Sequence, residues 1–391
     1  MNKVLFVLLR DFSVGGSLTS MLNLLQNLPQ DDVQIDVLML EHTGVLYHDE
    51  AVNANLLPED SILCSVYTSP KRLLKQKRYG ELLARLLLIS EKKLCGIPKA
   101  LDKRYQRAAK KYTGYDCVIA FQEGLSSEVA QYIPAKKRIA WIHNDIDKIY
   151  SVNDSGIKKI RRIYNNFDTI IGVSSAVQNS LMKYLPEYAE RYQVIYNTMD
   201  IDAIINKAEQ QVEIPQLEGF TGNVFVSVGR FAPQKRFDRV PQIAKNLVDH
   251  GIDFKWMLVG GGEEFEKVRQ SCIELGVENN IILCGSQANP YPYIKRADCM
   301  ILTSQYEAHP MVANEGLILH KPVITTRYPS ACEVIADKIN GIICENETLA
   351  IAEAIKMIVE DEKLFAVLKK NADTFVYTNE KIIQQVRELC E

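Results

Sequence analysis

The feature that most constrains the fold is a repeated alternation of short apolar runs, polar or glycine-containing loops and amphipathic stretches. In the first half of the chain the apolar runs cover residues 4–9, 34–40, 116–121, 138–142, 169–173 and 192–196. Each run has the length of a strand and ends in a turn-forming loop, so each predicts a buried strand. Strands that alternate with helices form a parallel sheet, because parallel strands need a crossover connection.

The same alternation restarts at Asn223, with predicted strands at 223–228, 254–259, 281–284, 299–302, 322–325 and 341–344. The polar stretch that ends at Gly222 contains Pro215 and Gly219, which is typical of an interdomain connection. A chain of 391 residues, 47% of them hydrophobic, is long enough for two domains with separate cores. The sequence therefore predicts two similar-sized, doubly wound α/β halves with a deep cleft between their carboxyl edges.

Charge, hydropathy and cysteine usage narrow the class of protein further. A net charge of −3 argues against a general nucleic-acid binder, and no stretch approaches the length of a membrane span. The first apolar run, at 4–9, is too short for the hydrophobic core of a signal peptide. The nine cysteines are scattered without a C-x-x-C motif, which favours reduced, buried thiols. We expect a cytoplasmic protein that is neither exported nor membrane-spanning.

The stretch 304–315 concentrates the candidate chemistry of the chain. It follows the predicted strand at 299–302, and a helical pattern begins within it and continues to Lys321-Pro322. The loop carries Glu307 and the helix carries Glu315, and the free N–H groups of the first helical turn favour an anion. Two carboxylates beside such amides suit a ligand with a sugar at one end and a nucleoside diphosphate in the middle.

Basic and glycine-containing loops follow other predicted strands of the second half. Arg230 and Lys235, after the strand at 223–228, offer a planar fork and a compact point charge that can neutralise a diphosphate without a metal. The alternative is that these side chains are only solvated. The stretch 284–286 ends another strand in a glycine, where backbone groups could read a base edge. The triplet 260–262 lacks the G-x-G-x-x-G spacing of dinucleotide sites, so it predicts a tight turn instead.

Polar groups also follow the predicted strands of the first half. Gly15 and Gly16 would let another molecule approach the backbone closely, or they form a plain tight turn. Glu123 follows the strand at 116–121. His143 follows the next strand and can hydrogen-bond a substrate hydroxyl or move a proton, although a lone histidine is more often structural.

Two D-x-D tripeptides have the form that can hold a divalent cation against a diphosphate. They are Asp145-Ile146-Asp147 and Asp200-Ile201-Asp202. Because this tripeptide is common by chance and occurs twice here, we do not predict a metal site.

Residues 71–111 interrupt the alternation with a strongly basic segment. Lysines and arginines there face only Glu81, Glu91 and Asp102, and a leucine-rich block at 82–89 lies between the basic residues. Such a segment can rest on anionic lipid headgroups or receive an anionic acceptor. The alternative is a set of solvated helices whose apolar face packs on the core.

These motifs together resemble glycosyltransferase family 4, the retaining sugar transferases built from two Rossmann-like domains in the GT-B architecture. The resemblance covers nearly the whole chain and is most specific from 225 to 325. The residues that carry it are Gly229-Arg230 with Lys235, the E-x7-E pair Glu307 and Glu315, Gly15-Gly16, Trp141-Ile142-His143 and Tyr196-Asn197-Thr198-Met199-Asp200. The last of these is similar to the family's N-G-x-D, with Thr198 where glycine is usual.

The resemblance implies a role for each matching residue. Catalytic roles fall to Glu307, His143, Arg230 and Lys235. Donor binding falls to Gly15, Gly16, Arg230, Lys235, Cys284, Gly285, Ser286, Glu307, His309, Pro310, Met311, Val312 and Glu315. Among these, Glu315 would accept from the ribose hydroxyls, and the amides around 310–312 would cap the distal phosphate. Acceptor contacts fall to Glu123, Asn144 and Asn197, and no metal or cofactor is implied.

The resemblance also implies an organisation and a reaction. Residues 1–200 would form an acceptor-side domain and residues 201–374 a nucleotide-sugar domain, and residues 375–391 would cross back to the first domain. The implied reaction moves a hexose or N-acetylhexosamine, with retention, from a nucleotide-diphosphate sugar, by prior UDP, to a saccharide acceptor. A cytoplasmic enzyme with a basic patch suits a lipid-linked acceptor in surface-polysaccharide assembly at the inner face of a membrane. Two alternatives remain, a nucleotide-sugar epimerase of the same fold and a non-catalytic glycan-binding partner.

Overall fold

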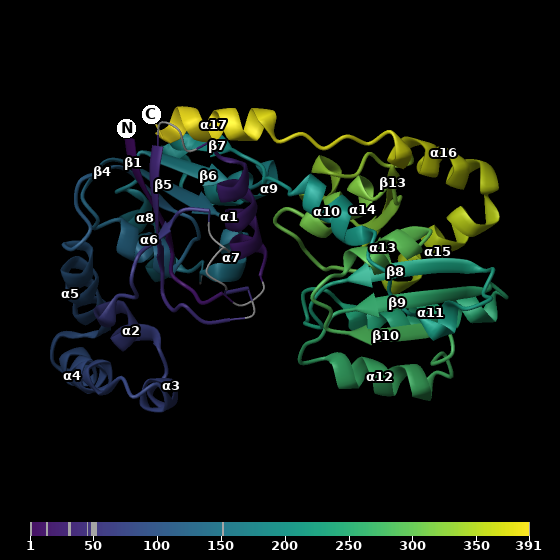
Figure 1. Cartoon of the computed structure of the whole chain (residues 1–391), viewed down its shortest axis with the longest axis horizontal. Helices are drawn as coiled ribbons and strands as arrows, with labels where there is room; N and C mark the ends of the chain where they lie inside the picture. The colour runs from purple at the N-terminus through teal and green to yellow at the C-terminus, as the bar shows by residue number, and fades with distance from the viewer. Residues whose placement is uncertain are drawn as a thin grey trace. The chain divides into compact units, whose positions relative to one another are not determined.

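The computed structural model describes residues 2–12, 15–29, 33–44, 46–47, 53–150 and 152–390, apart from the side chain of Cys95. The chain forms two compact units (Figure 1). The N-terminal unit comprises Met1–Met199 together with Asn379–Glu391, and the C-terminal unit comprises Asp200–Thr378.

The N-terminal unit is built on a parallel sheet whose described strands run in the order β3-β2-β1-β4-β5-β6-β7. Their bounds are β1 Asn2–Leu8, β2 Val33–Met39, β3 Asn55–Leu56, β4 Tyr115–Ala120, β5 Ala135–Ile142, β6 Thr169–Gly172 and β7 Tyr192–Val194. The residues from Val4 to Leu8 are inaccessible to solvent, as expected for a central strand with helices on both faces. This explains why the strands read as continuous apolar runs.

The helices of this unit include one from the end of the chain. Outside residues 61–109, the helices in order along the chain are α1 Gly16–Asn27, α6 Leu125–Ala130, α7 Ile146–Ile149, α8 Asp154–Tyr164 and α9 Ser175–Tyr184. A 3-10 turn covers Pro186–Arg191. The last helix, α17 (Glu380–Cys390), lies along this unit and buries Ile382, Val386 and Leu389 (Figure 1). Asn379 fixes its start, because its side chain bonds both the amide and the carbonyl of Met199, at 3.1 and 2.8 Å.

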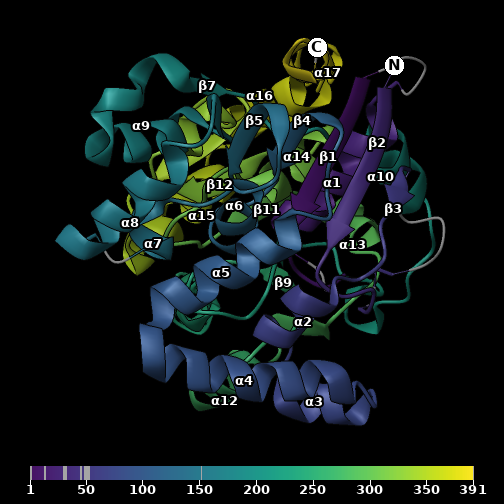
Figure 2. The ribbon, with the colours of Figure 1, turned by 90° about the vertical axis from the view of Figure 1, so that its left-hand side faces the viewer.

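Four helices between β3 and β4 form what we call the α2–α5 segment (Figure 2). They are α2 Ser61–Tyr67, α3 Pro70–Lys75, α4 Tyr79–Cys95 and α5 Ile97–Ala109. Asp60 caps α2 and Ser69 caps α3, as their side-chain oxygens accept amide hydrogens of the first turn. Arg72 joins α3 to the loops after β2 and β1, through Glu41 at 2.7 Å and Asp11 at 3.5 Å. The segment therefore lies beside the carboxyl edge of the sheet.

The C-terminal unit is built on a second parallel sheet, whose strands run in the order β10-β9-β8-β11-β12-β13. Their bounds are β8 Asn223–Val228, β9 Phe254–Val259, β10 Ile281–Gly285, β11 Cys299–Leu302, β12 Val323–Thr326 and β13 Gly341–Cys344. The helices are α10 Ile201–Ala208, α11 Val240–Asp249, α12 Phe265–Glu274, α13 Tyr291–Arg296, α14 Met311–Ile318, α15 Thr348–Glu360 and α16 Glu362–Asp373. Short 3-10 turns cover Pro215–Leu217, Phe237–Arg239 and Ala331–Glu333.

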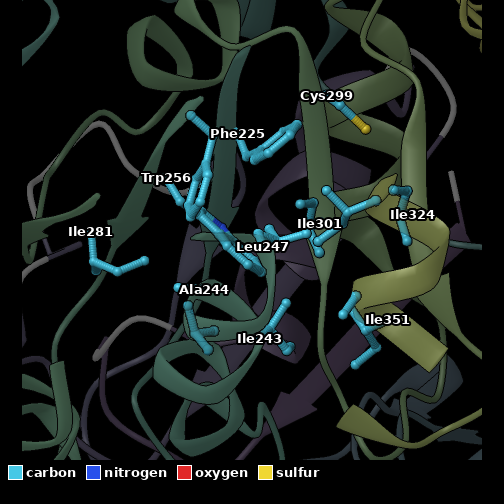
Figure 3. Packing of buried hydrophobic residues seen from close by; sticks show 14 of the residues in the cluster. Phe225, Ile243, Ala244, Leu247, Trp256, Ile281, Cys299, Ile301, Ile324 and Ile351 are labelled. Atoms are coloured by element: carbon cyan, nitrogen blue, oxygen red, sulfur yellow. The ribbon is translucent and has the colours of Figure 1, made fainter. Parts of the chain in front are cut away.

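The core of the C-terminal unit lies between its sheet and the helices α11 and α15. Phe225 and Trp256 from neighbouring strands pack edge to face and meet Leu247 of α11, while Ile301 and Ile324 extend the cluster toward Ile351 of α15 (Figure 3). The indole N–H of Trp256 donates to Ser227 Oγ, so the ring is buried without an unmet donor. This core fixes the strand ends from which the candidate site residues project.

The predicted fold class is confirmed, because both sheets are parallel and doubly wound. The strand order reverses between β1 and β4 in one unit and between β8 and β11 in the other, and ligands of such sheets bind outside the strand ends at that position. The prediction did not include β3, which has only two residues. Among the described residues, no helix has the combination of length and apolar character that crossing a bilayer requires.

Candidate active site

An ion pair marks the position in the C-terminal unit where the strand order reverses. Lys235, on the loop after β8, places its Nζ 2.7 Å from Oε1 of Glu307, on the loop after β11. The two side chains are only 21% and 10% exposed, so the pair is poorly screened by water. The sheet brings together two charged groups that the sequence separates by 72 residues.

Short hydrogen bonds hold the Glu307 loop in place. Ser304 Oγ donates to Glu307 Oε1 at 2.6 Å, and Ser330 Oγ donates to the Glu307 carbonyl at 2.7 Å. Gln234 donates to the Tyr306 carbonyl at 3.0 Å and to Glu307 Oε2 at 3.4 Å. Both carboxylate oxygens of Glu307 are therefore oriented before any ligand binds.

Backbone contacts connect the two loops directly. The Gln305 amide donates to the Gln234 carbonyl at 2.8 Å, and Thr303 Oγ1 donates to the Lys235 carbonyl at 2.7 Å. Such contacts restrict the motion of Lys235 relative to Glu307. The arrangement supplies a fixed cation beside a fixed carboxylate, which is the preorganisation that electrostatic catalysis needs.

Glu315, on α14, occupies an environment that opposes its ionisation. Burial raises the pKa of its carboxyl group to about 7, and the opposing effects of the Lys235 charge and of a hydrogen bond from Tyr291 are smaller. Burial and the same contact raise the pKa of the Tyr291 hydroxyl, which therefore stays a donor. Glu315 is thus placed to switch between a protonated and an ionised acceptor near neutral pH.

The first turn of α14 offers fewer free amides than the sequence pattern indicates. Pro310 has no N–H, and the Met311 amide already donates to the His309 carbonyl at 2.9 Å. Of the three positions assigned to phosphate capping, Val312 is the one whose amide donates to no described residue outside its own helix. His309 is buried, and burial lowers the pKa of its imidazole to about 4, so the ring is neutral at physiological pH.

Arg230 lies apart from the buried pair. Its guanidinium is 74% exposed and contacts Glu263 at 3.0 Å. Within the described part of the chain, no hydrogen bond or ion pair joins Arg230 to Lys235 or Glu307. The two cations predicted to act together are therefore on one loop but in different environments, Lys235 partly buried and Arg230 exposed.

The glycine triplet 260–262 is a close-packed turn and not a free phosphate loop. A Cβ on Gly260, whose φ is +149°, would lie 1.8 Å from the Gly229 carbonyl oxygen, and one on Gly262 would lie 2.4 Å from the Phe231 carbonyl oxygen. The Gly260 amide donates to the Gly285 carbonyl at 2.8 Å. This turn therefore packs directly against the backbone of the Gly229-Arg230 loop.

The predicted base-binding residues 284–286 lie beside that turn. A Cβ on Gly261 would come within 2.4 Å of Ser286 Oγ, and Gly285 takes a positive φ of 66°. Burial raises the pKa of the Cys284 thiol to about 12, so the thiol stays protonated. The end of β10 is therefore lined by small, uncharged groups, and the Cys284 and Gly285 carbonyls already accept from Gln287 Nε2 at 2.6 Å and from the Gly260 amide at 2.8 Å.

In the N-terminal unit, Glu123 holds the loop that carries His143. Its carboxylate accepts from the His143 amide at 2.7 Å and from Asn144 Nδ2 at 2.6 Å. Burial raises the pKa of Glu123 despite these bonds. The His143 ring packs against Phe121 at 4.7 Å between centroids and stacks on Trp141. The predicted acceptor residues Glu123 and Asn144 thus contact each other, and Glu123 holds the backbone at His143.

The remaining predicted residues of this unit are placed as follows. Asn197 is buried, and its amide oxygen accepts from Ser20 Oγ at 2.6 Å. A Cβ on Gly15 would meet the Arg10 guanidinium at 2.7 Å, whereas one on Gly16 would meet no atom within 4 Å. Open space at Gly16 is what a close backbone approach by a ligand requires.

Both D-x-D tripeptides have structural roles. Asp147 pairs with Lys183 at 3.7 Å, and Asp200 caps α10 by accepting from the Ala203 amide at 3.0 Å. These contacts account for one carboxylate of each tripeptide.

Three polar residues that contact the site were not predicted. Gln234 and Ser330 bond the Glu307 loop, and Tyr291 bonds Glu315. Gln234 adjoins Lys235 in the sequence, which is the one signal that could have identified it. Ser330 and Tyr291 become neighbours of the site only through the sheet order, so no local pattern marks them.

Comparison with known proteins identifies the family of the chain. Residues 14–203 match the family described as Glycosyltransferase Family 4, and residues 210–375 match the family described as Glycosyl transferases group 1. The N-acetyl-alpha-D-glucosaminyl L-malate synthase of Bacillus anthracis is 27% identical over 226 residues, which cover 54% of this chain and 58% of that protein. The chain thus spans less than two thirds of that relative's length.

Two further similarities are to a second curated glycosyltransferase and to a solved structure. The N-acetylgalactosamine-N,N'-diacetylbacillosaminyl-diphospho-undecaprenol 4-alpha-N-acetylgalactosaminyltransferase of Campylobacter jejuni is 24% identical, over 57% of this chain and 59% of that protein. The crystal structure of Anabaena HepE in complex with UDP superposes with a TM-score of 0.69 at 18% identity, covering 99% of this chain and 98% of that one. With the parallel sheets and the two family matches, these findings show that the chain belongs to the GT-B glycosyltransferases of the family 4 type.

Proposed function

We propose that the protein transfers a hexose or N-acetylhexosamine from a UDP-sugar to a saccharide acceptor, with retention of anomeric configuration. The observation that carries this proposal is the Lys235 and Glu307 pair, fixed where the strand order reverses and accompanied by Glu315 on α14. Lys235 and the start of α14 suit the diphosphate of such a donor. Glu307 suits its sugar and Glu315 its ribose.

The proposed reaction proceeds on one face of the donor sugar. The bond between the anomeric carbon and the phosphate oxygen breaks while the acceptor hydroxyl oxygen bonds to the same carbon from the leaving-group side. The departing phosphate oxygen takes the hydroxyl proton. Negative charge grows on the diphosphate in this step, and Lys235, Arg230 and the start of α14 stabilise it electrostatically. Because these groups supply the compensating charge, we propose that turnover needs no divalent metal.

We further propose that the acceptor is lipid-linked and belongs to the assembly of a bacterial surface glycan. The name of the Campylobacter jejuni relative places its acceptor on diphospho-undecaprenol. A lipid-linked acceptor requires the enzyme to work at the inner face of a membrane, and the basic 71–111 region suits that position.

Product analysis tests the proposal. The purified chain is incubated with UDP-glucose, UDP-galactose and their N-acetyl forms, singly, with detergent-dispersed polyprenyl-diphosphate saccharides from bacterial membranes. We expect one donor to give a lengthened acceptor whose new linkage keeps the donor's anomeric configuration by NMR. An inverted linkage, or activity that EDTA removes and Mn²⁺ restores, would contradict the mechanism.

The same samples separate the two alternatives. Incubation of each donor without acceptor, followed by sugar analysis, reveals an epimerase through an isomerised nucleotide sugar. A non-catalytic glycan-binding partner would show neither transfer nor UDP binding by calorimetry. The hydrogen-bonded pair of Lys235 and Glu307, with Glu315 within electrostatic reach of Lys235, favours the transferase, because a non-catalytic partner has no need of these charged groups.

A further inference from the structure

Helix α4 of the α2–α5 segment differs from an ordinary surface helix because it exposes large apolar side chains to solvent. A surface helix normally turns its apolar stripe toward the core and its charged side chains toward water. In α4 most of the large apolar side chains are exposed, whereas Leu88 is buried on the side that faces the protein, with Arg85 and Glu91 partly buried. The exposed fractions are Tyr79 63%, Leu83 60%, Leu86 55%, Leu87 55% and Leu94 87%. Their spacing of three and four residues places them along one face.

The inward side of α4 is held by charged groups. Arg85 donates to the Val66 carbonyl at the end of α2 at 2.6 Å. Both carboxylate oxygens of Glu91 accept hydrogen bonds from the guanidinium of Arg104 on α5, at 3.1 and 3.0 Å. Such bidentate pairs fix orientation strongly, so the outward direction of the leucines is set by the fold.

An exposed apolar row of this size is unusual for a free surface. Contiguous apolar patches on soluble proteins mark contacts with a membrane, a partner or a ligand. The neighbouring helices also expose large apolar side chains, with Leu74 of α3 57% exposed and Ile97 of α5 59% exposed. Helices α3 and α4 lie together at the same end of the α2–α5 segment (Figure 2), and each of α3 and α5 contacts α4.

The charges around this surface have one sign. The same helices and their connections carry exposed lysines: Lys71, Lys75, Lys77, Lys93, Lys99 and Lys103. In the part of the chain that the structure describes, none of these lysines has an ion-pair partner. The three acidic residues of the region are each paired with an arginine, Glu81 with Arg78, Glu91 with Arg104 and Asp102 with Arg162. The free charge of the surface is therefore positive.

We propose that the outward face of α3 and α4 docks onto an anionic lipid surface, with its leucines entering the interface and its lysines contacting lipid headgroups. An apolar face bordered by basic side chains is the pattern of a helix that lies in the plane of a membrane. A protein partner would leave these lysines unmatched unless it were acidic, whereas anionic lipid matches both features at once.

The proposed docking surface lies near the carboxyl edge of the N-terminal sheet. Arg72 joins α3 to the loops after β1 and β2, so the surface adjoins the carboxyl edge of the N-terminal sheet. This inference rests on the proposed function, since a lipid-linked acceptor lies at a membrane. Docking would bring that edge within reach of the acceptor without a spanning helix.

Vesicle sedimentation of the full-length chain, without substrates, tests the proposal. We expect binding to phosphatidylcholine vesicles that contain phosphatidylglycerol, weaker binding at high salt, and little binding to phosphatidylcholine alone. Lys75→Gln, Lys93→Gln and Lys99→Gln should each weaken binding about fivefold. The pair Leu83→Ser and Leu86→Ser should weaken it more than tenfold.

Matched variants on the C-terminal unit serve as controls. Leu349 and Ile273 are 65% and 53% exposed, so Leu349→Ser with Ile273→Ser removes equal apolar surface elsewhere. Lys267→Gln with Lys363→Gln removes exposed charge elsewhere. Both controls should bind vesicles as the wild type does. Circular dichroism checks that all variants are folded.

The possible outcomes separate the proposals. Absence of vesicle binding, equal binding to neutral and anionic vesicles, or binding that the Leu83 and Lys variants leave unchanged would overturn the docking proposal. So would a lipid-free oligomer, seen by ultracentrifugation, that Leu83→Ser with Leu86→Ser dissociates, because a second copy would then cover this face. Vesicle binding without sugar transfer would overturn only the proposed function, and transfer to a dispersed acceptor without vesicle binding would overturn only the docking.

Discussion

Lys235 Nζ lies 2.7 Å from Glu307 Oε1, so the principal cation of the candidate site is paired with a carboxylate of the protein itself. A bound diphosphate would replace part of that contact, and Lys235 would then share its charge between the leaving group and Glu307. Since Ser304 and Gln234 also donate to Glu307, the carboxylate stays oriented when the ammonium turns to the ligand.

Lys235→Ala should lower kcat by about a hundredfold or more, because one preorganised charge at the leaving group is lost. Steady-state kinetics with the donor identified by product analysis gives this value. The same change leaves the Glu307 carboxylate half-buried without its cation, which destabilises the unit by up to about 3–5 kcal/mol.

The double variant Lys235→Met with Glu307→Gln separates the two effects. It removes both charges, so most of the lost stability should return in urea unfolding while activity stays low. If the double variant recovers wild-type turnover, the charge of Lys235 is not used in the reaction and its role is structural.

Arg230→Ala should also lower turnover about a hundredfold, but with almost no effect on the free energy of unfolding. The guanidinium is mostly exposed, and its pair with Glu263 is a surface contact of little energetic weight. Glu263→Gln is the matched control, because it breaks the same pair from the other side. Equal kinetic losses in both variants would mean that the ion pair matters and the free guanidinium does not.

Gly260→Ala should destabilise the C-terminal unit by about 1–3 kcal/mol, since its Cβ would press on the Gly229 carbonyl oxygen. Gly276→Ala is the control. It shares a positive φ, at 67°, but its Cβ meets no atom within 4 Å, so it carries backbone strain alone. In a Trp141→Phe background, Trp256 fluorescence reports the urea unfolding of this unit. Equal losses in both variants would show that the close packing at Gly260 has no energetic weight.

The strands of both sheets could be predicted because burial on both faces makes them continuous apolar runs. Thr169–Gly172 and Asn223–Val228 illustrate this, as their observed bounds differ from prediction by at most one residue. The two-residue strand β3 could not be predicted, since Asn55 and Leu56 form no apolar run and pair only because β2 has a free edge. Long apolar runs encode strands, whereas short edge strands depend on the assembled sheet.

The site residues show the same division. The carboxylates Glu307 and Glu315 have a local spacing that the sequence displays. Their partners Ser330 and Tyr291 are set by strand order, which a local pattern does not contain. The outward direction of the α4 leucines was also hidden, because the sequence shows an apolar block at 82–89 without showing which side faces water. The contacts of Arg85 and Glu91 decide that side, and they involve α2 and α5.

The environment of Glu315 predicts a dependence on pH. Its pKa is raised from its ordinary value of 4.5 to about 7 in the folded protein. The folded state therefore prefers the protonated carboxyl, and this contribution to stability is present below pH 4.5 and is lost as pH rises through about 7. Glu315→Gln stays neutral at every pH. The variant should match the wild type near pH 4.5 and have a Tm several degrees higher, at least about 2–4 °C, near pH 8.

Ligand binding should show the opposite trend. An ionised Glu315 is the stronger acceptor for ribose hydroxyls, so the affinity of the wild type for UDP-glucose should rise as pH increases through about 7. UDP-glucose is the suitable probe because its diphosphate diester does not titrate in this range. Calorimetry of Glu315→Gln should give a weaker affinity that is nearly constant across the same range. If wild type and variant share one pH profile, another group controls donor binding, and Glu315 does not contact the ribose.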